Sequence, residues 1–340
     1  MTRRLRCAVV GVGYLGRFHA QKYQMIDLVE LVGVCDGDPV RAKAVGDELG
    51  VASYSDYRDL IGKVDLVTVA ASTQAHFEIA KAFLESGVHV CVEKPMTATL
   101  TEAEELVRLA RAKGLKLQVG HVERFNSALS AAKEKLGVPL FIECHRLAPF
   151  KPRGVDVDVV LDLMIHDLDV ILSLVKSPVA SVSAVGAPVL TALADIANAR
   201  IEFESGAVAN VTASRVSQVA TRKFRVFQSK QYLSIDFGSG EVNLTSLVGS
   251  WAGVTGNVTE SGAASLPVPL AFDAWNLEKA DALLEETKAF VRSVAYDEPV
   301  VVSGEDGLVA MRLAERIRTE IYGRLEKFDR ANRPEPAVRP

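Results

Sequence analysis

A glycine pattern near the N-terminus constrains the fold more than any other feature of the chain. Gly11, Gly13 and Gly16 form a G-x-G-x-x-G turn, with an apolar run directly before it and helix-like sequence directly after it. Such a turn lets the backbone approach a pyrophosphate and lets a helix pack closely on a strand. The next apolar run ends in Asp36, where a carboxylate can bind the ribose hydroxyls of an adenine dinucleotide and repel a 2′-phosphate. The pattern therefore predicts NAD in preference to NADP, with Arg41 close enough in sequence to pair with a 2′-phosphate.

The first 120 residues alternate short valine-rich runs with segments of helical periodicity. Runs that are apolar on both faces are typical of parallel strands covered by helices. We expect strands at residues 5–10, 28–35, 64–70, 88–92 and 115–119. We expect helices at residues 16–25, 40–49, 75–86 and 102–113, the last with a capping box between Thr101 and Glu104. This alternation predicts a doubly wound parallel sheet of the α/β class, which we assign to a first domain of residues 1–120.

After residue 120 the pattern changes to strands that follow one another without helices between them. This half predicts a second, α+β domain over residues 121–330 with an open, mostly antiparallel sheet. The expected strands are residues 140–147, 196–203, 207–214, 224–228 and 232–237, with hairpin turns at Ser205–Gly206 and Ser229–Lys230. The expected helices are residues 125–136, 160–175, 277–294 and 305–322, with weak strands or loop at 242–269 and a flexible tail at 331–340. The last helix could pack back on the first domain.

Composition and charge exclude several classes of protein. The chain has 340 residues, of which 49% are hydrophobic and 24% charged, as is ordinary for a packed protein with two domains. A net charge of −4 without a basic block argues against nucleic-acid or membrane-surface partners. Residues 178–194 are too polar and too interrupted to span a bilayer. The four cysteines form no pair or cluster with histidine, so neither a disulfide scaffold nor a zinc site is indicated, and we expect a cytoplasmic protein.

Lys94 lies where a doubly wound fold binds its ligands. The segment Val92-Glu93-Lys94-Pro95 directly follows a predicted strand, which puts the lysine at the carboxyl edge of the sheet. A single lysine is more often a solvated surface charge. Its position between a buried strand and a proline favours a functional role here.

A second polar group lies in an otherwise apolar helix. Asp162 and His166 are four residues apart and His166 and Asp169 three apart, which puts them on one face of a helix. Three polar groups on an apolar stripe are expensive to bury without a purpose, and a carboxylate beside an imidazole suits general acid–base chemistry. A wet helix face or an ion network in the core are the alternatives. A metal site is not expected, because no second histidine supports it.

In combination, the glycine turn, Glu93-Lys94-Pro95 and Asp162-x-x-x-His166 resemble the glucose–fructose oxidoreductase/inositol dehydrogenase (Gfo/Idh/MocA) family. The resemblance implies a Rossmann domain, a second domain whose open sheet forms homodimer or homotetramer contacts, and Lys94, Asp162 and His166 as catalytic residues. The family's Thr-Pro-x-x-x-His stretch is similar to residues 71–76, with Ser72 at the usual proline. The glycine run that often precedes the aspartate is Asp158-Val159-Val160 here. The cofactor-binding positions are then Gly11, Gly13, Tyr14, Leu15, Gly16, Asp36, Ala71, Ser72, His76, Glu93 and Lys94.

Residues 120–126 and 161–167 further resemble the branch of that family that contains UDP-N-acetylglucosamine 3-dehydrogenases, which serve glycan and lipid A assembly. The expected reaction is hydride transfer from a secondary hydroxyl of a sugar to NAD, with His166 as base, Asp162 orienting it and Lys94 stabilising the alkoxide. A basic cluster before the catalytic helix could bind a diphosphate or be merely solvated. The expected substrate-binding residues are Arg124, Asn126, Arg146, Lys151, Arg153 and Asp169. The alternatives are a simple-sugar or inositol dehydrogenase and a non-catalytic NAD-binding sensor.

Overall fold

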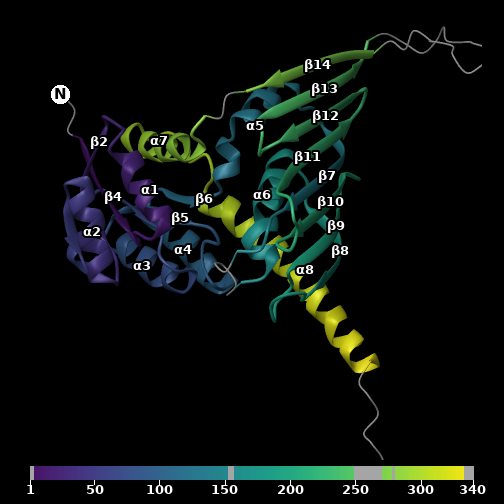
Figure 1. Cartoon of the computed structure of the whole chain (residues 1–340). Coiled ribbons are helices and arrows are strands. Elements are labelled where there is room, and N and C mark those ends of the chain that lie inside the picture. The colour runs from purple at the N-terminus through teal and green to yellow at the C-terminus, as the bar shows by residue number, and fades with distance from the viewer. Residues whose placement is uncertain (1–3, 152–156, 249–269, 278–279, 333–340) are drawn as a thin grey trace, which may run out of the picture.

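A computed structural model of the chain describes residues 4–151, 157–248, 270–277 and 280–332. Figure 1 shows two sheets of different kinds, the first covered by helices on both faces and the second on one. Helices from the end of the chain lie between the two sheets and contact both halves. Within the described residues, no helix is both long enough and apolar enough to cross a membrane.

The first sheet has six parallel strands in the order β3-β2-β1-β4-β5-β6. In this order β1 and β4 lie side by side where the winding direction reverses, which is the crevice where doubly wound sheets bind ligands. The doubly wound prediction is therefore confirmed. The strands are β1 (Leu5–Val10), β2 (Val29–Cys35), β3 (Ala52–Tyr54), β4 (Leu66–Val69), β5 (His89–Glu93) and β6 (Leu117–Gly120). The helices are α1 (Tyr14–Tyr23), α2 (Pro39–Leu49), α3 (Thr73–Glu85) and α4 (Leu100–Lys113), and a 3-10 turn, η1, spans Tyr57–Leu60.

Two details of this half differ from the sequence prediction. The edge strand β3 was not expected, because three residues are too few to show a pattern. The capping box of α4 was placed two residues too late. The Thr99 hydroxyl accepts a hydrogen bond from the Glu102 amide, and the Glu102 carboxylate accepts one from the Thr99 amide. Thr-x-x-Glu occurs twice in succession here, and the helix begins at the first copy.

The second sheet has eight strands in the order β14-β13-β12-β11-β7-β10-β9-β8. All neighbours are antiparallel except β7 and β10, which confirms a mostly antiparallel sheet. Turns at Ser205–Gly206 and Ser229–Lys230 join β9 to β10 and β11 to β12, as predicted. The strands are β7 (Pro139–Leu147), β8 (Val179–Ala187), β9 (Ile196–Phe203), β10 (Val208–Ser214), β11 (Thr221–Gln228), β12 (Gln231–Asp236), β13 (Glu241–Leu247) and β14 (Leu270–Asn276).

Strands β8 and β14 were missed, because neither alternates apolar and polar residues as a half-buried strand does. The helix expected at residues 125–136 is broken into shorter pieces. These are η2 (Val122–Phe125), α5 (Ser127–Ala132) and η3 (Lys133–Lys135). The catalytic segment begins as a π-turn, η4 (Val160–Met164), and continues as α6 (Ile165–Leu174).

The last two helices return to the first sheet. Helix α7 (Ala282–Ala295) begins later than predicted, and it places Phe290 and Val291 in the core formed by β1 and α1. Helix α8 (Gly304–Ala331) extends past the predicted end at residue 322. It begins on β6, where the Val119 amide donates a 3.0 Å hydrogen bond to the Val302 carbonyl. Helix α8 therefore packs on the first sheet at its N-terminal end. The tail at 333–340 lies outside the described residues.

Candidate active site

A cavity of about 590 Å³ opens at the carboxyl ends of β1, β2 and β4. Loops that follow these strands supply its walls, as expected for a dinucleotide site at the switch point of the sheet. Its lining includes five of the eleven predicted cofactor positions and adds Tyr57 and Arg58 from η1. The relevant lining residues are Gly11, Gly13, Asp36, Arg41, Tyr57, Arg58, Ala71 and Ser72.

The glycine turn has the shape that a pyrophosphate needs. Gly11 has a φ of +84°, and a Cβ there would lie 2.3 Å from the Ala71 amide nitrogen. A Cβ at Gly16 would lie 1.7 Å from the Gly11 carbonyl oxygen, so helix and turn touch. A Cβ at Gly13 would meet nothing within 4 Å, and Gly13 begins α1 without a side-chain cap. Space is therefore open beside the N-terminus of α1, where a helix can bind an anion. Tyr14 and Leu15 are exposed beside this turn.

Asp36 is held rigidly at the far end of the cavity. Its carboxylate accepts hydrogen bonds of 2.9 Å from both the Val12 and the Asp38 amides. The Arg41 guanidinium lies 3.1 Å from the same carboxylate. Asp36 is thus nearly buried, with its negative charge partly balanced by Arg41. The residues present fit an adenine dinucleotide, with the acid placed for the ribose and the glycine turn for the phosphates.

His76 ties two loops of the cofactor edge together. Its ring is buried, with one nitrogen 3.0 Å from the Ala71 carbonyl oxygen and the other 3.0 Å from that of Pro95. Ser72 stands at the start of α3, where its side chain makes no capping hydrogen bond. Burial lowers the pKa of His76, and a neutral imidazole can donate a hydrogen bond to only one of these two carbonyls at a time.

Lys94 reaches from the end of β5 to the π-turn in the other half of the chain. Its Nζ donates a 2.7 Å hydrogen bond to the Asp162 carbonyl oxygen and lies 3.5 Å from the Asp162 carboxylate. No hydrogen bond or ion pair within the described residues joins Asp162 to His166. Asp162 therefore contacts the lysine and does not orient the histidine as the sequence suggested. Asp162 lies in the π-turn, whereas His166 lies in the regular helix α6 that follows it.

His166 lies among positive charges at the same edge. Burial, then the charges of Lys94 and Arg146, hold the pKa of His166 well below its ordinary value. The imidazole is therefore neutral at neutral pH, which is the form that a general base needs. The His121 ring stands edge-on to it with the ring centroids 6.3 Å apart. A second histidine is thus close in space, although none is close in sequence.

The predicted substrate-binding residues do not form one surface. Arg146 is buried, donating to Asp167 at 2.8 and 2.9 Å and to Glu123 at 2.8 Å. It therefore belongs to an ion network in the core and is separated from the exposed Lys151. Arg153 lies outside the described residues.

Arg124 and Asn126 take part in a second set of contacts near η2. The Arg124 Nε lies 3.3 Å from the Asp169 carboxylate, and both groups are largely buried. Asn126 begins α5, where its side-chain oxygen accepts a hydrogen bond from the Ala128 amide. Arg124 and Asp169 thus pair with each other in the structure. Their role in binding a substrate stays a prediction.

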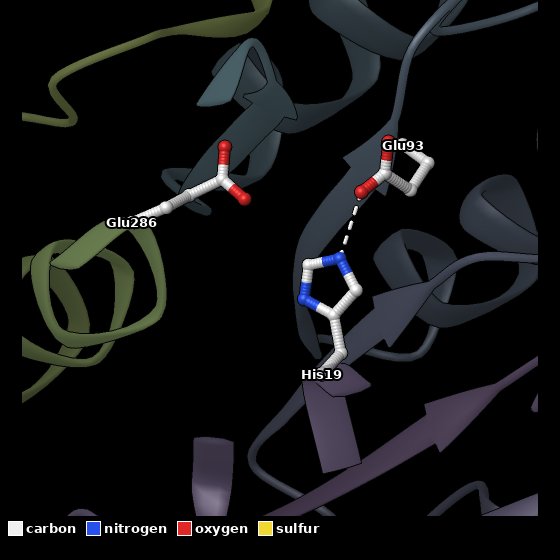
Figure 2. Close-up of side chains that lie close together, drawn as sticks. All are labelled: His19, Glu93 and Glu286. Carbon is white, nitrogen blue, oxygen red and sulfur yellow. Dashed lines mark hydrogen bonds and ion pairs between the residues drawn. The ribbon is translucent and has the colours of Figure 1, made fainter. Parts of the chain in front are cut away.

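A buried acidic group lies directly behind Lys94 and was not found from the sequence. The His19 Nε2 is 2.7 Å from the Glu93 carboxylate, whose other oxygen accepts the Lys94 amide at 3.2 Å. Figure 2 shows Glu286 of α7 beside this pair. One atom of each residue that could bind a metal ion, a histidine nitrogen or a carboxylate oxygen, lies within 4.8 Å of the other two. Both Glu286 carboxylate oxygens are buried, and neither has a hydrogen-bond partner among the residues that the structure describes. Burial raises the pKa of Glu286 well above its ordinary value, and the nearby Glu93 and Asp169 raise it further.

The comparisons with known proteins agree with this architecture. Residues 5–121 match the oxidoreductase family with an NAD-binding Rossmann fold named Gfo/Idh/MocA, and residues 131–234 match the C-terminal domain of that family. UDP-N-acetylglucosamine 3-dehydrogenase of Acidithiobacillus ferrooxidans is 36% identical over 95% of this chain and 99% of its own length. Its solved structure has a TM-score of 0.85 at 35% identity and covers 95% of this chain and 99% of that one.

Inositol dehydrogenases are also similar to this chain, at lower identity. Myo-inositol 2-dehydrogenase of Thermotoga maritima is 29% identical over 91% of this chain and 94% of its own length. Scyllo-inositol dehydrogenase of Lactobacillus casei, solved with bound NAD(H) and scyllo-inositol, shares the fold with a TM-score of 0.75 at 21% identity, covering 95% of this chain and 98% of that one. Because both halves of the sequence match it and a relative is similar from end to end, the chain belongs to the Gfo/Idh/MocA family of oxidoreductases.

Proposed function

We propose that this protein oxidises a secondary hydroxyl of a nucleotide sugar, with UDP-N-acetylglucosamine oxidised at carbon 3 as the preferred candidate. The observation that carries the proposal is the meeting of Lys94 with the turn of Asp162 beside a neutral His166, at the carboxyl edge of the first sheet. The end-to-end similarity to a UDP-N-acetylglucosamine 3-dehydrogenase supports the choice of substrate.

In the proposed reaction, NAD held by the glycine turn and Asp36 would supply the acceptor for the hydride that leaves the carbon bearing the hydroxyl. The His166 imidazole takes the hydroxyl proton as the carbonyl forms, since it is neutral and unprotonated at neutral pH. The Lys94 ammonium stabilises the negative charge that develops on the oxygen. Asp162 acts mainly through Lys94, because its carbonyl and carboxylate are the groups that hold the ammonium in place.

For the cofactor we propose NAD in preference to NADP. The Asp36 carboxylate is fixed by two amides and would repel a 2′-phosphate. Arg41 and Arg58 also line the cavity, but Arg41 pairs with Asp36, and Arg58 pairs with Asp56 and Glu78. Both guanidiniums are thereby partly neutralised, which weakens their attraction for an additional phosphate.

We also propose that the uncovered face of the second sheet forms a homo-oligomer. Figure 1 shows α5, α6 and α8 on one face only. On the other face, cross-strand neighbours Phe141, Phe227 and Tyr232 stack with centroids 5.5 and 4.8 Å apart, and the row continues to Phe272, which is 74% exposed. Aromatic rows of this kind are enriched in interfaces. Light scattering of the native protein and of Phe272→Ser tests this, and a wild-type monomer contradicts it.

The substrate proposal is tested with a panel of UDP-sugars, free sugars and inositols, followed by the absorbance of reduced nicotinamide. We expect turnover with UDP-N-acetylglucosamine and none with free sugars or inositols. Turnover only with inositols would favour the second candidate, which the inositol dehydrogenases among the relatives support. Binding of NAD without turnover of any polyol would favour a sensor and contradict the roles given to Lys94 and His166.

Four free cysteines, all buried, support our proposal of a cytoplasmic location.

A further inference from the structure

Asp158 stands just before the π-turn, where members of the Gfo/Idh/MocA family often have glycine. Its side chain is fully buried. Its Oδ1 accepts hydrogen bonds from the Val160 amide at 3.1 Å and the Leu161 amide at 3.2 Å. Its backbone carbonyl accepts the Asp162 amide at 3.0 Å. Asp158 therefore caps the turn that carries Asp162, through both its side chain and its backbone.

The second oxygen of Asp158 is bound by helix α8. The Arg318 Nε donates a 2.6 Å hydrogen bond to this oxygen, and the Tyr322 hydroxyl donates one of 3.1 Å. The Tyr322 oxygen also accepts the Ala194 amide at 3.4 Å. A buried carboxylate between two elements is costly unless both sides are paired. Here all of the Asp158 contacts converge on the turn and on one helix.

Helix α8 is itself fixed to the cofactor half. It begins at Ser303, which bridges to Gln118 of β6, and Gly304 and Gly307 lie so close to that strand that a Cβ on either would be 2.6 Å from a Leu117 or Val119 side chain. The same helix therefore contacts the sheet that binds the cofactor and, further along, the Asp158 carboxylate.

These contacts form one uninterrupted series. It runs from β6 through α8 to Arg318 and Asp158, then through the capped π-turn to the Asp162 carbonyl and the Lys94 ammonium. We propose that Asp158, held by Arg318 and Tyr322, is a positioning residue for the reaction: it sets where the Asp162 turn stands relative to Lys94. This inference rests on the proposed function for the roles of Lys94 and His166.

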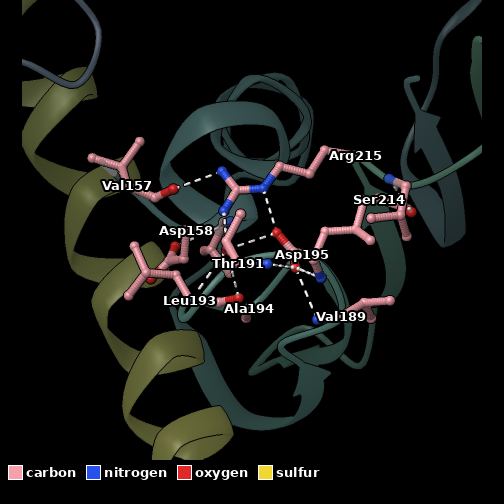
Figure 3. A network of polar contacts seen from close by, with 12 residues as sticks. Val157, Asp158, Val189, Thr191, Leu193, Ala194, Asp195, Ser214 and Arg215 are labelled. Carbon is pink, nitrogen blue, oxygen red and sulfur yellow. Dashed lines mark hydrogen bonds and ion pairs between the residues drawn. The ribbon is translucent and has the colours of Figure 1, made fainter. Parts of the chain in front are cut away.

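The opposite side of the turn is fixed independently. Figure 3 shows the Arg215 guanidinium donating to the Val157 carbonyl, at 2.7 Å, and to the Asp195 carboxylate, at 2.8 Å. Asp195 in turn accepts three backbone amides from the loop at residues 189–191. Because these contacts do not involve Arg318, we expect loss of the α8 contact to displace the turn without unfolding its surroundings.

The test compares two arginines of α8 with different hydrogen-bond acceptors: the Asp158 carboxylate for Arg318 and backbone carbonyls of β8 for Arg316. Arg318→Met removes the contact with Asp158. Arg316→Met is the matched control, since Arg316 is exposed and donates only to the Val179 and Ala180 carbonyls of β8. Asp158→Asn keeps a cap acceptor but presents a donor to Arg318, and Arg318→Lys restores the charge. The measurements are kcat and KM for UDP-N-acetylglucosamine, the Kd for NAD, and amide exchange of residues 157–168.

We expect Arg318→Met and Asp158→Asn to lower kcat by about 10- to 100-fold, as small misplacements of reacting groups do. The Kd for NAD and the KM should change less than twofold, Arg318→Lys should recover part of kcat, and Arg316→Met should match wild type. Amide exchange needs no substrate, so it tests the contact even if UDP-N-acetylglucosamine is not oxidised: residues 157–168 should exchange faster in Arg318→Met and at the wild-type rate in Arg316→Met. Equal exchange in the two methionine variants, or a kcat loss equal to the loss of folded protein, would overturn the inference.

Discussion

The Nζ of Lys94 donates a 2.7 Å hydrogen bond to the carbonyl oxygen of Asp162, which joins the end of a Rossmann strand to the first turn of a helix in the other half of the chain. The lysine therefore has a fixed place before any substrate arrives. A preorganised ammonium at a developing alkoxide costs no reorganisation during the reaction. The same bond makes the distance between the two halves part of the active-site geometry.

Removal of either proposed catalytic group should abolish most of the turnover. We expect Lys94→Met and His166→Asn each to lower kcat by at least ~10²- to 10⁴-fold, the range that general acid–base catalysis contributes. The Kd for NAD should change little, because the glycine turn and Asp36 bind the opposite end of the dinucleotide. Lys43→Met is the control, since Lys43 is an exposed lysine on α2 that pairs only with Asp47. Near-normal turnover of both active-site variants would remove the mechanism.

Asp36 should set the cofactor preference. We expect wild type to bind NAD at least about tenfold more tightly than NADP, and Asp36→Ser to lose most of that difference. The substitution removes the repulsion of a 2′-phosphate and frees the Arg41 guanidinium to bind it. Titration with both cofactors checks this. Asp38→Asn, which loosens Arg41 but leaves the Asp36 charge, should keep the preference for NAD.

The pH dependence of kcat/KM should reflect the lowered pKa of His166. A general base acts in its unprotonated form, and a lowered pKa keeps His166 unprotonated at lower pH. We therefore expect that protonation of His166 does not reduce kcat/KM as the pH falls to about 6.5, the ordinary pKa of histidine. Arg222 contributes one of the positive charges that lower this pKa. Arg222→Gln should therefore move the acid limb of the profile toward neutral pH. A profile that does not move would exclude His166 as its source.

Glu286 should make the protein less stable as the pH rises. Its pKa is raised in the folded state, so above about pH 4.3 the unfolded chain loses a proton that the folded chain keeps. Stability from this group is therefore complete at lower pH and falls as the pH increases, by at most about 1.4 kcal/mol per pH unit. Glu286→Gln cannot ionise, and its advantage over wild type should widen between pH 5 and pH 8.

Urea unfolding of Glu286→Gln and of Glu285→Gln measures this effect. Glu285 is the exposed neighbour on α7 and pairs with Lys288, so its removal should give no pH-dependent difference. If Glu286→Gln shows no widening either, Glu286 is ionised and a cation must neutralise it beside His19 and Glu93. Loss of wild-type stability on adding a chelator would then identify a metal ion.

Local sequence predicted the groups whose surroundings are local. The three glycines and Asp36 follow strands whose apolar runs are unmistakable, and their geometry depends on the turn itself. Lys94 was predicted at the sheet edge because the end of a buried parallel strand defines that edge. Each of these inferences needed only the residues within one βαβ unit.

Residues whose partners lie far along the chain could not be placed in this way. Arg146 looked like part of a basic cluster, but Glu123 and Asp167 neutralise it in the core. Glu286 lies beside His19 only because α7 packs on α1. Asp162 contacts Lys94 across the two halves of the chain, and its turn is a π-turn, which no residue pattern distinguishes from ordinary helix. These contacts depend on how the two sheets come together.

The return of α7 and α8 to the first sheet bears on how the chain reaches its final form during synthesis. Phe290 and Val291 complete the core around β1, and Val302 and Met311 complete the core on the other face. When the glycine turn and all six parallel strands have left the ribosome, these apolar surfaces are still uncovered, and the strands of the second sheet must be made before anything can cover them. The nascent cofactor half would therefore remain an open intermediate, in need of protection from aggregation, until α7 and the first turns of α8 are translated.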